Sequence, residues 1–128
     1  MDILVTGSAG FLGSQLVRDL IACEHQVYGI DIRKDQQSQK VVCADLQTVA
    51  SDVFAKQKFD WIIHLASNVG GFLHNALQQN LIDYEMSLFD KVLKFAKRAD
   101  CENIIFTSNQ EVEVEVEVEI SKVEEQQV

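Results

Sequence analysis

The chain of 128 residues has the length of one domain, and its 47% apolar and 24% charged residues are the balance of a soluble globular protein. The formal net charge of −9 argues against binding to nucleic acid or to an anionic membrane. No apolar run approaches the ~20 residues of a membrane span and no export signal starts the chain, so we expect a cytoplasmic protein. The three cysteines fit neither a metal spacing nor a disulfide framework, which indicates reduced thiols and no metal site.

Short apolar runs alternate along the chain with segments of helical periodicity. Strands are predicted at 2–6, 26–30, 41–43, 61–66 and 103–108, and helices at 11–23, 48–57 and 76–99. The first helix carries its apolar face at Leu12, Leu16, Leu20 and Cys23. Strands that are apolar on both faces and alternate with helices form a parallel sheet covered on both sides. We therefore predict an α/β fold with a doubly wound parallel sheet of order 3-2-1-4-5.

The turn after the first strand is rich in glycine, with the sequence TGSAGFLG at residues 6–13. Gly7 permits the tight turn, Gly10 leaves room for a pyrophosphate near the backbone, and Gly13 lets the helix pack close to the sheet. The N-terminus of the following helix offers free N–H groups and the positive end of its dipole to phosphates. A strand, a glycine turn and a helix in this order predict a dinucleotide site.

An acid stands at the end of the second strand, 18 residues after Gly13. The carboxylate of Asp31 can accept hydrogen bonds from both ribose hydroxyls of an adenosine, and it would repel a 2′-phosphate. This favours NAD over NADP, whereas Arg33 two residues later could accept a 2′-phosphate and keeps NADP as an alternative. Asp31 could also be a plain turn aspartate at a strand end.

These signals resemble the extended short-chain dehydrogenase/reductases, the NAD-dependent sugar-nucleotide epimerase/dehydratase family. TGSAGFLG is similar to the family's TGxxGFxG turn, and Asp45-Leu46 matches its aspartate at the adenine ring. HLAS at 64–67 resembles the HxAA that lines the central part of the cofactor, and VGG at 69–71 resembles members like GDP-fucose synthase. The resemblance covers residues 1 to about 110 and implies a Rossmann-type fold. Asp45 could instead be a helix-entry residue, and His64 a packed strand-end histidine.

Together the turn, the acid and the resemblance predict one set of cofactor contacts. The predicted NAD(P)-binding residues are Gly7, Ser8, Ala9, Gly10, Phe11, Leu12, Gly13, Asp31, Ile32, Arg33, Asp45, Leu46, Leu65, Ala66 and Ser67.

In the catalytic part of the family pattern, this sequence differs from the expected residues. The family pairs a tyrosine with a lysine four residues on, and the lysine lowers the tyrosine's pKa so that it can take a proton from a sugar hydroxyl. Here Tyr28 and Tyr84 are followed at that spacing by Ile32 and Leu88. Aligned on the dehydratase version, the hydroxyl position after the fifth strand holds Asn109, and only a one-residue slip would let Ser108 serve. We expect the chain alone to be inactive, with Ser108 as the sole candidate catalytic residue.

The last 18 residues form a separate acidic feature. Seven of them are Glu against one Lys, a net charge of −6, whereas residues 1–110 carry 13 acids and 10 bases. EVEVEVEVEI at 111–120 puts apolar and acidic side chains on opposite faces of a strand, which excludes a central strand buried on both faces. An edge strand, pairing with another chain, disorder and a low-complexity expansion all fit the pattern.

We therefore predict a dinucleotide-binding domain at 1–110 and an acidic tail at 111–128. The function implied by the resemblance is the NAD(H)-binding part of a nucleotide-sugar epimerase, dehydratase or reductase. A nucleotide sugar would be a substrate only if another chain completes the site, and a homo-oligomer is one way to do so. The alternative is a non-catalytic dinucleotide-binding module or a truncated fragment.

Overall fold

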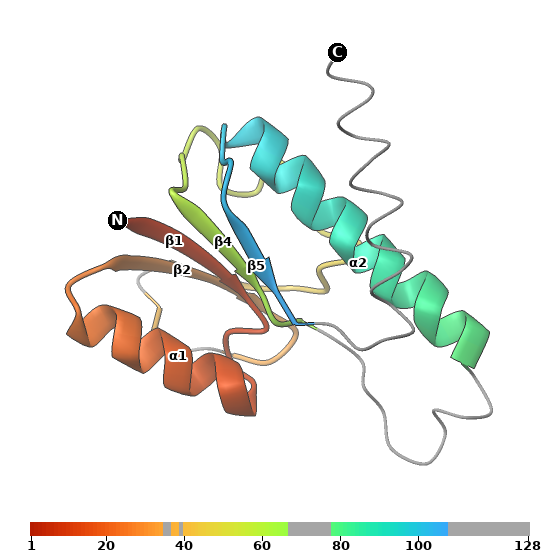
Figure 1. Ribbon diagram of the computed structural model, residues 1–128, viewed down its shortest axis with the longest axis horizontal. Helices are drawn as coiled ribbons and strands as arrows, with labels where there is room; N and C mark the ends of the chain where they lie inside the picture. The colour runs from red at the N-terminus through yellow and green to blue at the C-terminus, as the bar shows by residue number, and fades with distance from the viewer. Residues whose placement is uncertain (35–36, 39, 67–77, 108–128) are drawn as a thin grey trace.

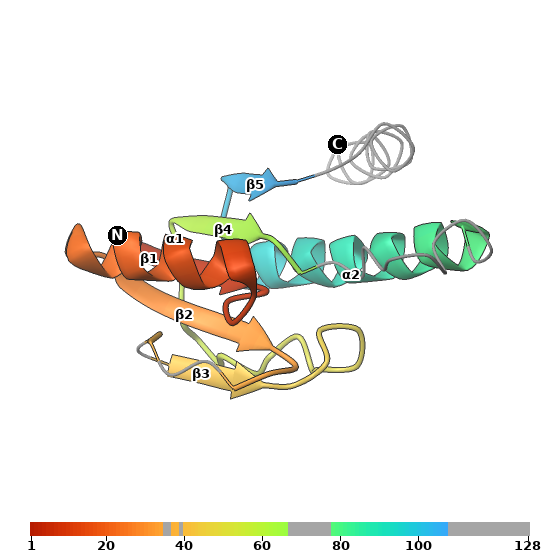
Figure 2. The same ribbon diagram turned by 90° about the horizontal axis from the view of Figure 1, so that it is seen from below.

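A computed structural model describes residues 1–34, 37–38, 40–66 and 78–107 of the chain. Five parallel strands form one sheet in the order β3-β2-β1-β4-β5, as predicted. The strands are β1 (Asp2–Thr6), β2 (Gln26–Asp31), β3 (Lys40–Cys43), β4 (Trp61–His64) and β5 (Ile104–Phe106), and the helices are α1 (Phe11–Ala22) and α2 (Gln78–Arg98). Figure 1 shows the two helices on opposite sides of the sheet, and Figure 2 shows the strands following one another from β3 to β5.

The two central strands consist of residues that fit a pleated surface buried on both faces. In β1, Ile3, Leu4 and Val5 are almost fully buried, and their side chains alternate between the two sides of the sheet. Strand β4 is shorter than predicted and ends at His64, although the N–H of Leu65 still donates to the carbonyl oxygen of Thr6 at 3.1 Å. Strand β5 covers the apolar residues Ile104–Phe106 of the predicted range 103–108, and Ser108 lies outside the described residues.

The helix predicted at 48–57 is wrong: this segment consists of successive turns. Most of its backbone hydrogen bonds join residues three apart, such as Val53 N–H to the Ala50 carbonyl at 3.1 Å. Ala55 has a positive φ of 52°, which a right-handed helix cannot contain. The apolar residues that suggested helical spacing are nevertheless packed inward, and Phe54 is 4% exposed. Spacing alone therefore located the buried side chains and missed the backbone conformation.

The side of the sheet covered by α2, here the α2 face, carries the larger core. It contains Leu4, Ile62, Leu88, Val92 and Phe95 with an edge-to-face cluster of Tyr28, Phe54 and Phe59. The opposite side, the α1 face, has a smaller aliphatic core of Ile3, Val5, Val17, Val27 and Ile63. No helix in the described part of the chain is long and apolar enough to cross a membrane.

The buried side of α1 differs from the predicted one. Gly13 and Val17 are the buried residues of this helix, with Leu16 and Leu20 packed against them. Leu12 is 55% exposed and Cys23 is exposed, so the two ends of the predicted apolar face do not contact the sheet. At the start of α1, Gly13 lies directly against the carbonyl of Gly7, where a Cβ would not fit. The buried side of α1 therefore includes a glycine, which hydropathy periodicity ignores.

Candidate functional site

The glycine turn between β1 and α1 is held by close contacts between backbone atoms. Gly7 has a φ of +73°, and its N–H donates to the carbonyl of Ile30 at 2.8 Å, which ties the turn to β2. A Cβ on Gly7 would lie 2.8 Å from the backbone nitrogen of Ala66, and one on Gly13 would overlap the Gly7 carbonyl oxygen. Both positions therefore require glycine. Gly7 needs it for its positive φ and its contact with Ala66 after β4, and Gly13 needs it so that α1 can approach the turn.

The N-terminus of α1 is open. Gly10 occupies the cap position and provides no side-chain hydrogen bond, and no acidic residue stands in the first turn. The first N–H groups of a helix have no intrahelical partner, so this end presents donors and a partial positive charge. Phe11 and Leu12 are 86% and 55% exposed beside it. Such an end suits an anion more than any other ligand.

Ser8 and Ala9 complete the turn in different ways. The N–H of Ala9 donates to the carboxylate of Asp31 at 3.0 Å, which links the turn to the end of β2. Ser8 is fully buried, and its Oγ has no hydrogen-bond partner in the described part of the structure. Buried hydroxyls are rarely left without a partner. The Ser8 Oγ is therefore a buried polar atom of the turn to which the described residues offer no hydrogen bond.

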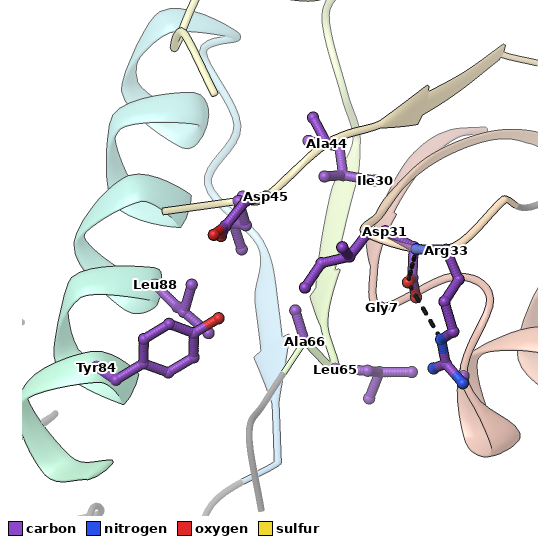
Figure 3. A pocket seen from close by; sticks show the side chains of 13 residues that line it. Gly7, Ile30, Asp31, Arg33, Ala44, Asp45, Leu65, Ala66, Tyr84 and Leu88 are labelled. Carbon is purple, nitrogen blue, oxygen red and sulfur yellow. Dashed lines mark hydrogen bonds and ion pairs between the residues drawn. The ribbon is translucent and has the colours of Figure 1, made fainter. Parts of the chain in front are cut away.

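Asp31 is a buried carboxylate, 8% exposed, at the carboxyl end of β2. Besides the Ala9 N–H, it accepts the N–H of Arg33 at 2.8 Å, and the Arg33 Nε lies 3.5 Å from the same oxygen, Oδ1. Figure 3 shows the Arg33 side chain beside this carboxylate. Each carboxylate oxygen can accept two hydrogen bonds, so Asp31 keeps capacity for further donors. Its role as a strand-end turn residue and a role toward a ligand are thus compatible.

A cavity of about 320 Å³ opens at the carboxyl edge of the sheet (Figure 3). This volume lies within the ~300–1,000 Å³ of small-molecule sites, and in open α/β sheets such sites lie at this edge. The cavity is lined by Gly7, Gly10, Ile30, Asp31, Ile32, Arg33, Ala44, Asp45, Leu46, Leu65, Ala66, Tyr84 and Leu88. Nine of the predicted cofactor-binding residues are among these thirteen. The structure therefore gathers four separate predicted segments around one space.

Other predicted site residues do not line the cavity. Ser8, Ala9 and Gly13 shape the turn behind it, and Phe11 and Leu12 lie on the exposed start of α1. Ser67, the VGG segment at 69–71, Ser108 and Asn109 lie outside the described residues.

Sequence reasoning missed four wall residues, namely Ile30 and Ala44 at the ends of β2 and β3 and the pair Tyr84 and Leu88 on α2. The spacing of four residues between Tyr84 and Leu88 was a visible signal, but it reads as an ordinary buried helix stripe. In Figure 3 the Tyr84 ring reaches into the cavity on the side where Asp45 lies. Burial, and then the charges of Asp45 and Glu85, raise the pKa of the Tyr84 phenol above its ordinary value. Tyr84 is therefore a neutral hydroxyl at neutral pH, and it adds an amphipathic group to the wall that also holds Asp45.

Asp45 shapes the loop after β3 as well as facing the cavity. Its Oδ1 accepts the N–H of Gln47 at 2.9 Å, and its carbonyl accepts the N–H groups of Thr48 and Val49. These bonds form the turn that begins the segment predicted as a helix. Asp45 is thus a turn-initiating residue whose carboxylate also stands at a cavity wall.

The parallel sheet and its glycine turn define a Rossmann-type α/β domain. The family model for the NAD dependent epimerase/dehydratase family matches residues 3–125. The chain belongs to this family, which confirms the resemblance seen in the sequence. The match also runs past residue 110, where the quoted motifs end.

Curated relatives of the chain are longer proteins. Protein CapI of Staphylococcus aureus is 26% identical over 129 residues, and UDP-glucose 4-epimerase of Caenorhabditis elegans is 31% identical over 140 residues. Both alignments cover 88% of this chain and 39% of the relative. The chain thus spans about two fifths of the length of the curated relatives it matches.

Solved structures with the same fold include nucleotide-sugar enzymes. UDP-glucose 4-epimerase from Bifidobacterium longum, in complex with NAD+ and UDP, superimposes with a TM-score of 0.73 at 25% identity. MoeE5 in complex with UDP-glucose and NAD gives 0.74 at 23% identity. Each match covers 86% of this chain and 37% of the other. The expected cofactor, NAD, is therefore the one held by solved structures of this fold.

Proposed function

We propose that this chain is the NAD(H)-binding part of a nucleotide-sugar epimerase, dehydratase or reductase. One observation carries the proposal: the glycine turn, Asp31, Asp45 with Leu46, and Leu65 with Ala66 line one cavity at the carboxyl edge of the sheet. These segments are far apart in sequence, and each carries a different part of the family's cofactor pattern. Their convergence supports binding of one extended ligand.

The chemistry of the cavity fits the parts of a dinucleotide. The open N-terminus of α1 and the cavity wall at Gly10 suit the pyrophosphate. The Ser8 hydroxyl, which has no hydrogen-bond partner among the described residues, lies in the same turn. The remaining acceptor capacity of Asp31 suits the adenosine ribose. The apolar surface of Leu46 and the carboxylate of Asp45 suit the adenine ring with its amino group. When bound, NAD would supply the hydride acceptor for oxidation of a sugar hydroxyl.

The cofactor site is tested by adding bulk where the pyrophosphate would lie. A Cβ on Gly10 would lie 3.2 Å from the Arg33 guanidinium and 3.3 Å from the Gly7 carbonyl, so a larger side chain extends over the turn. Calorimetric titration with NAD should give saturable binding for the parent and none for Gly10→Leu. Ala22→Leu is the matched control, because it adds a leucine at the exposed far end of α1. Unchanged NAD binding in folded Gly10→Leu would refute the assignment.

We expect NAD to bind more tightly than NADP. The 2′-phosphate of NADP would face the Asp31 carboxylate, and like charges at short range cost affinity. Arg33→Ala should widen the preference, because it removes a side chain that can pair with a phosphate while both backbone bonds to Asp31 remain. Tighter binding of NADP by the parent would show that Arg33 sets the choice.

We further propose that the chain alone does not turn over nucleotide sugars. No tyrosine of its 128 residues is followed by a lysine at the family spacing, so the proton acceptor for the sugar hydroxyl is not supplied by that pair. This observation also favours the second candidate, a non-catalytic dinucleotide-binding module. NADH formation and sugar interconversion should be undetectable with a panel of nucleotide sugars. Turnover by the parent that disappears in Ser108→Ala would overturn both the proposed inactivity of the chain and the non-catalytic alternative.

A further inference from the structure

The hydroxyl of Thr6, the last residue of β1, is buried and contacts three groups at the end of β4. It lies 3.1 Å from the backbone nitrogen of Leu65, 3.1 Å from that of Ala66, and 2.6 Å from Nδ1 of His64. Thr6 is fully buried and His64 is 5% exposed. The Leu65 N–H is shared with the Thr6 carbonyl, so β1 holds this corner through both its backbone and its side chain.

Counting protons fixes the direction of each of these bonds. A threonine hydroxyl has one proton and two lone pairs, and backbone N–H groups can only donate. The N–H groups of Leu65 and Ala66 therefore use the two lone pairs of Thr6 Oγ1. The hydroxyl proton is left to donate to His64 Nδ1, which must be unprotonated, so the proton of the imidazole is on Nε2.

The surroundings of His64 keep it in this neutral form. Its ring packs against Phe89, with 6.1 Å between the ring centroids, and Phe89 in turn packs edge-on against Phe106. Burial lowers the pKa of His64 to about 4. At neutral pH the imidazole is thus a fixed acceptor that orients the Thr6 proton away from the two backbone N–H groups.

The corner that Thr6 holds is a wall of the cavity. Leu65 and Ala66 both line it, and the Ala66 nitrogen is the atom that approaches Gly7 so closely that no Cβ fits there. A shift of this backbone would therefore move the glycine turn as well. We propose that Thr6 is a positioning residue of the cofactor site, and that its hydroxyl, oriented by His64, holds the backbone of Leu65 and Ala66 against the turn. The expected effect on NAD affinity rests on the proposed NAD site. The positioning of Leu65 and Ala66 by the Thr6 hydroxyl rests only on the geometry of the unbound chain.

The mechanism is tested without any cofactor. In long-range ¹H–¹⁵N NMR spectra at neutral pH, His64 of the parent should show a protonated Nε2 and an unprotonated Nδ1. Thr6→Val keeps the side-chain shape and removes the hydroxyl, so hydrogen exchange at Ala66 should accelerate roughly fivefold to tenfold, the worth of one net hydrogen bond. Exchange at Leu65 should accelerate less, because its N–H keeps the Thr6 carbonyl as an acceptor. Exposed amides of α1 serve as the internal control. A proton on Nδ1, or unchanged exchange at both amides, would overturn the proposal.

Thr6→Ser separates the hydroxyl from the methyl group. It keeps the donor and both lone pairs, so amide protection at Leu65 and Ala66 and the His64 tautomer should match the parent. If Thr6→Val does not fold, this variant decides: loss of protection in folded Thr6→Ser would show that packing of the methyl group, and not the hydroxyl, holds the corner.

The consequence for binding is measured by titration with NAD. The dissociation constant should rise roughly fivefold to tenfold in Thr6→Val and stay within about twofold of the parent in Thr6→Ser. Absence of NAD binding by the parent would refute the proposed function, whereas the exchange and tautomer measurements would still decide the role of Thr6. Equal NAD affinity of the parent and Thr6→Val would show that the corner does not position the site.

Discussion

The two faces of the sheet are built differently. The α2 face is packed across its width, with an aromatic cluster at Tyr28, Phe54 and Phe59 and further aromatic contacts out to Phe106. The α1 face has a smaller aliphatic core over β1, β2 and β4, and Ile105 of β5 is 49% exposed. The glycine turn runs from β1 into α1, and most of the cavity wall residues come from strand ends. Stability should therefore depend more on the α2 face, and ligand binding more on the turn.

The largest loss of stability is expected at the centre of the aromatic cluster. Phe54 is 4% exposed and contacts Tyr28, Phe59 and Phe95, so Phe54→Ala should lower the free energy of unfolding by about 3–5 kcal/mol. Urea unfolding followed by circular dichroism measures the change. Phe11→Ala, the same substitution at an 86% exposed site, should change it by less than about 0.5 kcal/mol. Similar losses in both variants would contradict the placement of the core.

Acid should destabilise the α2 face through His64. Burial holds the folded-state pKa of His64 at about 4, below the ordinary histidine pKa of 6.5, so between these values the unfolded chain binds the proton and the folded chain does not. Stability is therefore highest above pH 6.5 and falls as the pH drops toward 4, by about 3 kcal/mol in total from this group. Urea unfolding from pH 7.5 to 4.5 measures the profile.

One histidine variant isolates this contribution to the pH profile. His64→Gln should flatten the profile relative to the parent, because glutamine does not titrate. Parallel profiles of the parent and His64→Gln would show that other groups cause the acid sensitivity.

A smaller loss is expected on the α1 face. Val17 is fully buried, and Val17→Ala removes two methyl groups, so the free energy of unfolding should fall by about 1.5–2.5 kcal/mol. Ile21→Ala on the same helix, at 37% exposure, should cost less. A loss at Val17 as large as that at Phe54 would remove the contrast between the faces.

The smallest effect is expected on the outer surface of α2. Lys94 Nζ lies 3.1 Å from the Asp90 carboxylate, but the two side chains are 59% and 55% exposed. Exposed ion pairs of this spacing contribute about 0.3–0.5 kcal/mol. Asp90→Asn should therefore change the free energy of unfolding by no more than this, and a loss above about 1 kcal/mol would show that surface charge matters more than assumed.

Sequence reasoning succeeded where one residue type is tied to one conformation or one pattern. Runs such as DILVT and WIIH are apolar on both faces, which fixed the sheet class and strand order, and the left-handed φ of Gly7 follows from its place in the turn. It failed at 48–57, because apolar spacing reports burial and not backbone conformation. It also missed Tyr84 as a wall residue of the cavity, since a helix stripe that packs on a sheet and one that lines a cavity have the same period.

The role of Thr6 was beyond the reach of spacing arguments. Its partners Leu65 and Ala66 are about 60 residues away, and they meet it only because β1 and β4 are neighbours in the sheet. The sequence did contain the alternative that the structure supports for His64, a packed histidine at a strand end. Pairwise proton assignments of this kind require the three-dimensional neighbours of each polar atom.

The central claim, that this chain holds NAD in the cavity at the carboxyl edge of the sheet, is tested most directly by mapping amide shifts during an NAD titration of ¹⁵N-labelled protein. Saturable shifts should appear at Gly7, Gly10, Asp31, Asp45 and Ala66, and amides at the opposite edge, such as Gln26 and Asn103, should stay unchanged. Shifts that do not saturate, or that gather away from the glycine turn, would contradict the account.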